Sequence, residues 1–129
     1  MKTLEQIIEQ QKDLIKGQGA SEKEIVDAEK ELKMTFANDY RLYLKKYGAV
    51  SFDARELTGL VKVNRINVIN VTKELWEKTG ELYLNMYVVE DLGVDGVIIL
   101  QDSKGVIYQC VYGNKADKLC DSLVEYLED

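Results

Sequence analysis

Carboxylates in the last third of the chain are the side chains with the greatest potential for chemistry. Four of them, Glu90, Asp91, Asp95 and Asp102, lie in a stretch (79–103) that contains no lysine or arginine. Glu90 or Asp91 paired with Asp102 could serve as the acid and base of a glycosidase. However, the stretch supplies no oxyanion donor and no basic residue to orient such a pair. We therefore expect these carboxylates to bind a partner and the chain not to be an enzyme.

Two tyrosines accompany these carboxylates. Tyr87 and Tyr108 are candidate aromatic anchors for a protein partner, and each could equally be a core residue. Because alternate residues of a strand face opposite ways, the four carboxylates cannot all point in the same direction. Asp95 and Asp102 fall in expected turns, so we expect them to be the most exposed of the set.

The composition excludes several kinds of site. The chain has no histidine, which removes Ser/His/Asp and Cys/His nucleophile systems and most zinc and haem sites. Two cysteines, Cys110 and Cys120, are too few for a disulfide framework, and we expect both in the core. The segment 91–96 lacks the alternating acidic ligands of a calcium loop. The sequence therefore predicts no cofactor, no metal and no catalytic residue.

Charge is distributed unevenly along the chain. Of the net charge of −6, residues 1–50 contribute zero, with 9 basic and 9 acidic side chains. Residues 51–129 contribute all of it, with 8 basic and 14 acidic side chains. Such a field repels nucleic acid and attracts basic proteins, although acidity can also simply support solubility.

The N-terminus and the hydropathy pattern indicate the cellular compartment in which we expect the protein. No apolar run approaches the roughly 18 residues that a membrane-spanning helix needs. Glu5, Gln6 and Glu9 stand where a secretory signal peptide would be apolar. We therefore expect a cytoplasmic protein that does not contact the membrane.

The first half of the chain shows helical periodicity. Thr3 with Gln6, and Ser21 with Glu24, have the spacing of capping boxes. The first helix is expected to run to the glycines of segment 17–20, and its apolar stripe comprises Leu4, Ile7, Ile8, Leu14 and Ile15. In the second helix Ile25, Ala28 and Leu32 face inward, and Glu29 is expected to pair with Arg41.

A third helix is predicted from Asn38, as its N-cap, to Tyr47, with Gly48 as its stop. Its stripe of Tyr40, Tyr43, Leu44 and Tyr47 is read as core, with the hydroxyl groups reaching the surface.

In the second half of the chain, the spacing of apolar residues changes from a mainly helical pattern to a mainly strand-like one. Segment 52–63 favours extended structure, and segment 67–80 favours a helix that ends at Gly80. Three strands are expected at 87–92, 96–102 and 105–113, joined by turn sequences as an antiparallel meander. A terminal helix is predicted from the stripe Leu119, Cys120, Leu123, Val124 and Leu127. The fold class is thus α+β: a single domain, 1–129, in which an antiparallel sheet packs with N-terminal helices and a C-terminal helix.

The order of these motifs resembles the SUKH superfamily, small α+β domains of bacterial immunity proteins and of a fungal regulator of cell-wall assembly. The resemblance covers about residues 21–129. One departure is Phe36-Ala37, where the family usually has Leu-Pro. The motifs that carry the resemblance are the Ile25, Ala28, Glu29 and Leu32 pattern, "DYRLYLKKYG" (39–48), "ELTGL" (56–60), the Asn-rich helix start at 67, the meander, and "DSLVEYL" (121–127).

This resemblance implies a binding function. Bacterial members look like antidotes that bind the toxin of their own strain, and many such toxins are basic nucleases. The expected partner is accordingly a basic toxin domain, and the expected partner-binding residues are the carboxylates and tyrosines named above. The alternative is an interaction module in a regulatory or cell-wall complex. The sequence predicts no particular oligomeric state.

Overall fold

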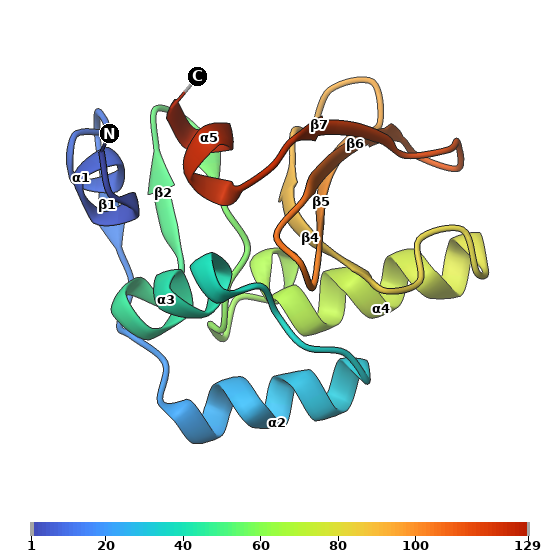
Figure 1. Cartoon of the computed structure of the whole chain (residues 1–129), viewed down its shortest axis with the longest axis horizontal. Helices are drawn as coiled ribbons and strands as arrows, with labels where there is room; N and C mark the ends of the chain where they lie inside the picture. The colour runs from blue at the N-terminus through green and yellow to red at the C-terminus, as the bar shows by residue number, and fades with distance from the viewer. Residues whose placement is uncertain (1, 129) are drawn as a thin grey trace.

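The computed structural model describes residues 2–128, which form five α-helices and two antiparallel sheets. This α+β architecture, with its C-terminal meander and terminal helix, confirms the predicted fold class (Figure 1). In chain order the elements are α1 (Leu4–Glu9), β1 (Ile15–Lys16), α2 (Glu22–Leu32), α3 (Asn38–Tyr47), β2 (Val50–Phe52), β3 (Arg55–Glu56), the 3-10 turn η1 (Asn64–Ile66), α4 (Val68–Thr79), β4 (Met86–Asp91), β5 (Val97–Asp102), β6 (Ile107–Val111), β7 (Asp117–Cys120) and α5 (Leu123–Glu128).

The four-stranded sheet is a meander in the order β4-β5-β6-β7. The smaller sheet, β1-β2-β3, joins it through an antiparallel bridge between Leu57 and Glu90. Beside this bridge the Thr58 N–H donates to the Val89 carbonyl over 2.9 Å. The two sheets are therefore connected at the outer edge of β4.

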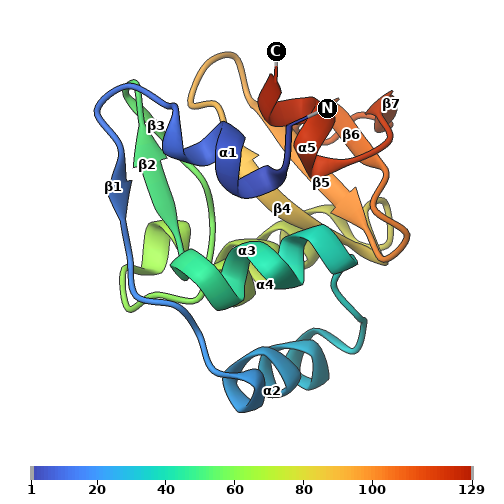
Figure 2. The same cartoon turned by 60° about the vertical axis from the view of Figure 1, so that its left-hand side comes forward.

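Helices cover both faces of the four-stranded sheet (Figures 1 and 2). On one face Val89, Ile99 and Ile107 pack into a core shared with α1, α2, α3 and α5. On the other face Leu100 and Cys110 pack with Leu75 of α4. The sheet thus separates two apolar clusters, and Cys110 is buried as predicted, whereas Cys120 is half-buried.

The tyrosine stripe of α3 is core, as predicted, but the expectation that its hydroxyl groups reach the surface is wrong for Tyr40 and Tyr43. The Tyr40 hydroxyl shares a 2.8 Å hydrogen bond with Thr58 Oγ1, and the Tyr43 hydroxyl donates to the Thr58 carbonyl over 2.6 Å. Both lie inside the protein, where a hydroxyl needs a partner because water is excluded. The Tyr47 hydroxyl donates to the carboxylate of Glu9, which ties α1 to α3.

Helix α3 ends at Gly48, as predicted, in a tight γ-turn. Gly48 has φ +70° and ψ −57°, and the Ala49 N–H donates to the Tyr47 carbonyl over 2.7 Å. The predicted start is wrong by one residue, because Ala37 is the N-cap and Asn38 is the first helical residue. The family's Leu-Pro position is occupied by Phe36-Ala37, and the Ala37 N–H donates to the Tyr87 hydroxyl.

Both terminal helices are shorter than predicted. Helix α1 stops at Glu9, and the chain turns through Asp13 (φ +58°) so that Ile15 pairs with Ser51 and is 69% exposed. At the other end, residues 117–120 form an edge strand, which leaves Leu119 46% exposed. In both places the apolar spacing matched a helix, while pairing with a neighbouring strand decided the structure.

Other local predictions are confirmed. Both capping boxes form, and Arg41 pairs with Glu29 at 2.6 Å. Helix α4 begins at the Asn67 cap and ends at Gly80 (φ +68°). Extended structure in segment 52–63 is limited to the last residue of β2, to the two residues of β3 and to single bridges at Leu57 and Gly59. The chain turns between β2 and β3 through Asp53 and Ala54, both with positive φ.

Candidate partner-binding surface

The structure places the six predicted partner-binding residues in three separate locations. Two are interior, two build the β5–β6 turn, and two are exposed in the β4–β5 turn. In that order the pairs are Tyr87 and Glu90, Asp102 and Tyr108, and Asp91 and Asp95.

Tyr87 lies in the core and offers no surface to a partner in this fold. Its hydroxyl accepts the Ala37 N–H at 3.0 Å and donates to Gln101 Oε1 at 2.5 Å. Gln101 in turn donates to Asp39, whose other oxygen accepts the Leu123 N–H at the start of α5. Burial raises the pKa of Tyr87 well above its ordinary value. Tyr87 is therefore a core residue, which is the second of the two roles that the sequence left open, and not an anchor.

Glu90 is also interior, at 1% exposure. A bulge in β4 sets Glu90 opposite Ile99, a residue of the α3-facing core. Arg55 donates to both of its oxygens, at 3.0 and 2.8 Å, and the Tyr126 hydroxyl donates to it at 2.6 Å. The hydrogen bonds that Arg55 donates to Glu90 raise the pKa of Arg55. The expectation that no basic residue offsets this carboxylate is therefore wrong.

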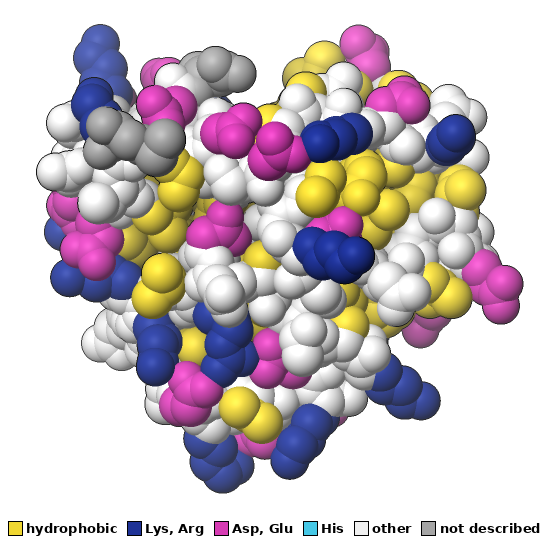
Figure 3. All heavy atoms as spheres, viewed as in Figure 1, with side chains coloured by type: hydrophobic (Ala, Val, Ile, Leu, Met, Phe, Trp, Pro, Cys, Tyr) yellow, Lys and Arg dark blue, Asp and Glu magenta, His cyan; other side chains and the backbone are white. Residues whose placement is uncertain are grey.

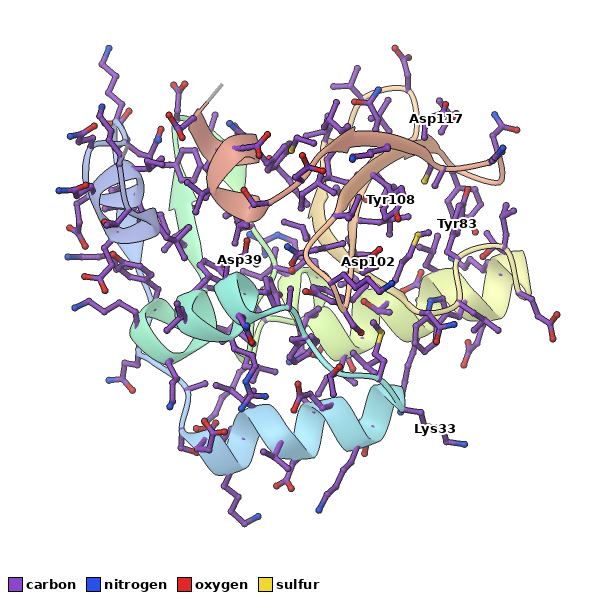
Figure 4. All side chains as sticks on the ribbon, in the orientation of Figure 1. Lys33, Asp39, Tyr83, Asp102, Tyr108 and Asp117 are labelled. Atoms are coloured by element: carbon purple, nitrogen blue, oxygen red, sulfur yellow. The ribbon has the colours of Figure 1, made fainter. Side chains whose placement is uncertain are left out.

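Asp102 organises the β5–β6 turn. Its Oδ1 accepts the N–H groups of Lys104 and Val106, at 3.0 and 3.1 Å, and its Oδ2 accepts the Tyr108 hydroxyl at 2.9 Å. Asp102 and Tyr108 lie side by side on the sheet (Figure 4). The hydrogen bond to Asp102 and partial burial raise the pKa of Tyr108. Asp102 is half-buried by these contacts, which corrects its placement among the most exposed carboxylates.

The surroundings of Asp102 and Tyr108 are not uniformly acidic. Lys118 of β7 stands opposite Tyr108 of β6. Figure 3 shows apolar side chains over β6 and β7 between lysine or arginine side chains. This face therefore has a mixed charge and does not present the acidic surface that the sequence suggested.

The carboxylate pairs considered for glycosidase chemistry are not brought together. Asp102 stands opposite Met86, whereas Glu90 stands opposite Ile99, so the two acids face opposite sides of the sheet about 10 Å apart along the strands. Among residues 2–128, no group of three or more His, Cys, Asp or Glu side chains gathers as a metal site. Within the same residues, no helix is long and apolar enough to cross a membrane.

Asp91 and Asp95 are exposed at the end of the β4–β5 hairpin. Asp91 Oδ1 accepts the Gly93 N–H at 2.9 Å, and Asp95 occupies a positive-φ position of the turn (+54°). Within the described part of the chain, no lysine or arginine forms an ion pair with either carboxylate. These two acids therefore present to solvent a negative charge that no ion pair neutralises. Lys78 of α4 lines the same hollow as Asp91, but it is paired with Glu74.

Exposed apolar residues accompany these carboxylates, and the sequence reasoning missed them. The Tyr112 N–H donates to the Gly96 carbonyl at 2.8 Å, which brings the end of β6 against the β4–β5 turn. Four apolar side chains here are between 40% and 62% exposed: Leu92, Val94, Val111 and Tyr112. We call these four residues, together with Asp91 and Asp95, the hairpin-end surface.

The β4–β5 turn, which carries part of the hairpin-end surface, projects beyond the sheet (Figures 1 and 2). At that end of the molecule, Figure 3 shows hydrophobic and acidic side chains next to one another. The signal in the sequence was the presence of Leu92 and Val94 inside the glycine-rich turn 91–96, where polar residues are usual.

Comparison with known proteins gives one family. The family model SUKH_5, described as SMI1-KNR4 cell-wall, matches residues 2–129. The chain belongs to the SUKH family. This match extends the resemblance beyond residues 21–129 to include the first helix, which confirms the family recognised from the sequence. A search of curated proteins found no match to the chain. Membership of the SUKH family points to protein–protein interaction, and in this SUKH domain the hairpin-end surface is the candidate for it.

Proposed function

We propose that this SUKH domain is a non-enzymatic immunity protein that acts in the cytoplasm, binding and neutralising a toxin domain with a basic surface, such as a nuclease. The observation that carries the proposal is the hairpin-end surface, where exposed apolar side chains adjoin two carboxylates that no basic residue of 2–128 pairs with. Apolar side chains supply binding energy when they are buried in an interface. Uncompensated carboxylates favour a partner of opposite charge.

The charge distribution supports the same partner. All of the net charge of −6 arises from residues 51–129, which include the meander. A nuclease must hold phosphates and so presents basic side chains. A negative field over one part of the surface raises the rate at which a basic protein associates, and salt weakens this effect.

A second candidate function is an interaction module in a regulatory or cell-wall complex. The description of the matching family, SMI1-KNR4 cell-wall, supports it. The two functions differ in what loss of the chain does: an immunity protein protects against one toxin, whereas an interaction module does not.

Growth rescue tests the proposal. The C-terminal domain of a large secreted protein encoded beside the gene for this chain is expressed with and without the chain, and an unrelated nuclease serves as a specificity control. We expect the chain to restore growth against its neighbour's toxin and not against the control nuclease. Equal killing in the presence and absence of well-expressed chain would overturn the immunity function. Turnover of nuclease, glycosidase or esterase substrates by the purified chain would contradict its non-enzymatic part.

A further inference from the structure

Two adjoining hollows lie between helix α4 and the end of strand β4. One has a volume of about 250 Å³ and the other about 220 Å³, and both are lined by Val71, Val88 and Asp91. Tyr112 of the hairpin-end surface closes the larger one, together with Leu75. Because the hollows share three lining residues, they form one short groove, which we call the α4 groove.

The α4 groove has apolar walls, formed mainly by Val71, Val88 and Ile98, and two basic residues in its lining, Lys78 and Arg65. Each of these cations is held by an acid of the same lining, which leaves one carboxylate, Asp91, without a basic partner. Its other acids are already paired, since Glu74 accepts from Lys78 at 2.7 Å and Glu56 accepts from Arg65 at 2.5 Å. Asp91 uses Oδ1 for the Gly93 N–H, and no lysine or arginine in 2–128 forms an ion pair with it. A lysine or arginine side chain has the matching form, an aliphatic stem that packs on apolar surface and a cationic end that pairs with a carboxylate.

The rim of the α4 groove is suited to an interface. Tyr112 lines the groove and is 44% exposed, and Leu92 and Val94 are exposed in the adjoining β4–β5 turn. A tyrosine supplies a large contact area at low entropic cost, and surrounding apolar residues exclude water from a central polar contact. A charge pair formed inside such a rim is less screened by salt than one on an open surface.

We infer that the partner inserts one lysine or arginine side chain into the α4 groove, where Asp91 receives the charge and Tyr112 covers the stem. This inference rests on the proposed function, because the occupant is a side chain of the basic toxin domain. Charge complementarity favours this occupant: once the Glu74–Lys78 and Glu56–Arg65 pairs are counted, the groove keeps one unpaired carboxylate beside its apolar residues, and the proposed partner has a basic surface.

Surface plasmon resonance with the toxin domain identified by growth rescue tests the inference at two salt concentrations. The variants are Asp91→Asn, which keeps an oxygen for the Gly93 N–H, and Tyr112→Ala. The matched control is Asp117→Asn, because Asp117 is an exposed carboxylate on β7 of the same sheet and its loss changes the net charge equally (Figure 4). We expect Asp91→Asn and Tyr112→Ala each to raise Kd at least tenfold, mainly through faster dissociation, and Asp117→Asn to change it less than twofold.

A double-mutant cycle identifies the inserted residue. Each surface lysine or arginine of the toxin domain is replaced by alanine and measured against the parent chain and Asp91→Asn. We expect one toxin variant whose loss of affinity largely disappears in the Asp91→Asn background, since both changes remove the same contact.

The outcomes separate this inference from the proposed function. If the toxin binds the parent chain, Asp91→Asn and Tyr112→Ala equally well, the α4 groove is not the docking site and the immunity function stands. If the toxin fails to bind the parent chain at all, the proposed function fails and the inference with it. If sedimentation shows that Tyr112→Ala dissociates a dimer of the chain, the groove is a self-interface and the inference is overturned.

Discussion

Arg55 and Glu90 form a two-point ion pair between strands β3 and β4. The guanidinium Nε lies 3.0 Å from one carboxylate oxygen, and a second nitrogen lies 2.8 Å from the other. The same guanidinium lies over the rings of Phe52 and Tyr126, at 5.1 and 5.6 Å from their centroids. This arrangement joins the small sheet, the meander and helix α5 at one point.

Removing Arg55 should therefore destabilise the fold. Arg55→Met leaves the buried Glu90 carboxylate without its counter-charge, and we expect the free energy of unfolding in urea to fall by about 3 kcal/mol. The matched control is Arg65→Met, because the Arg65–Glu56 pair is also bidentate but solvent-exposed, and its loss should cost less than about 1 kcal/mol. Equal losses for both variants would show that the interior pair does not hold the two sheets.

Stability should be lost at alkaline pH and stay flat near neutrality. Burial raises the pKa of Tyr40, Tyr43 and Tyr87 above the ordinary value of 10.0 and raises that of Tyr83 to about 12. Above pH 10 the unfolded chain releases these protons while the folded chain keeps them, so the free energy of unfolding decreases as the pH rises from 10 to 12.

Absorbance at 295 nm and circular dichroism would follow this transition together. We expect tyrosine ionisation and loss of helical signal to coincide above pH 10. Because the chain has no histidine, stability should be nearly constant between about pH 6 and 8, and burial of the Cys110 thiol, which raises its pKa, adds to the loss above about pH 8. Full ionisation of the tyrosines in a protein that remains folded would contradict their burial.

Two glycines with nearly the same φ should respond very differently to substitution. Gly48 (φ +70°) and Gly80 (φ +68°) both end helices, but a Cβ at Gly48 would lie 2.1 Å from the Gln18 carbonyl oxygen, whereas nothing lies within 4 Å of one at Gly80. Gly80→Ala should lower the free energy of unfolding by about 1–3 kcal/mol from backbone strain alone, because φ +68° with ψ −132° lies outside the left-handed helical region. Gly48→Ala should lower the free energy of unfolding clearly more than Gly80→Ala does, because the backbone at Gln18 must move to make room for the Cβ. Gly48→Val should lower it further still. Equal melting temperatures for the two alanine variants would show that residues 17–19 do not pack tightly against α3.

Asp102 should contribute to stability and not to partner affinity. Asp102→Ala removes the acceptor for two backbone N–H groups and the Tyr108 hydroxyl, and we expect a loss of about 2 kcal/mol in urea unfolding. The control Asp117→Ala, at an exposed carboxylate of the same sheet, should stay within about 0.5 kcal/mol. A stable Asp102→Ala variant that binds the toxin domain more weakly would return Asp102 to the binding surface.

Most predictions that depended on neighbouring residues in the chain succeeded, although the N-cap predicted at Asn38 is Ala37. The capping boxes at Thr3 and Ser21 form because a cap needs only the next turn of its own helix. Gly48 and Gly80 end their helices because a positive φ is a property of one residue and its peptide bonds. The meander was predictable because short turns between β-branched runs leave antiparallel pairing as the nearest option.

Burial of particular side chains could not be predicted from the strands alone. The sequence pattern places Tyr87 and Glu90 in a strand. A bulge in β4 then decides which face Glu90 occupies, and Arg55, which lies 35 residues earlier in the chain, pairs with it. Leu119 and Ile15 match a helical stripe, yet each lies in a strand at the edge of its sheet.

By itself, the sequence determined the fold class, most of the elements and the family of this protein, because local propensities and their order along the chain carry that information. Only the tertiary structure decided which carboxylates reach solvent. Asp91 and Asp95 are exposed because their turn projects past the sheet, while Glu90 is interior because two distant segments, which carry Arg55 and Tyr126, meet over it. The exposure of a side chain depends on which segments pack against it in space, and its neighbours in the sequence do not determine those contacts.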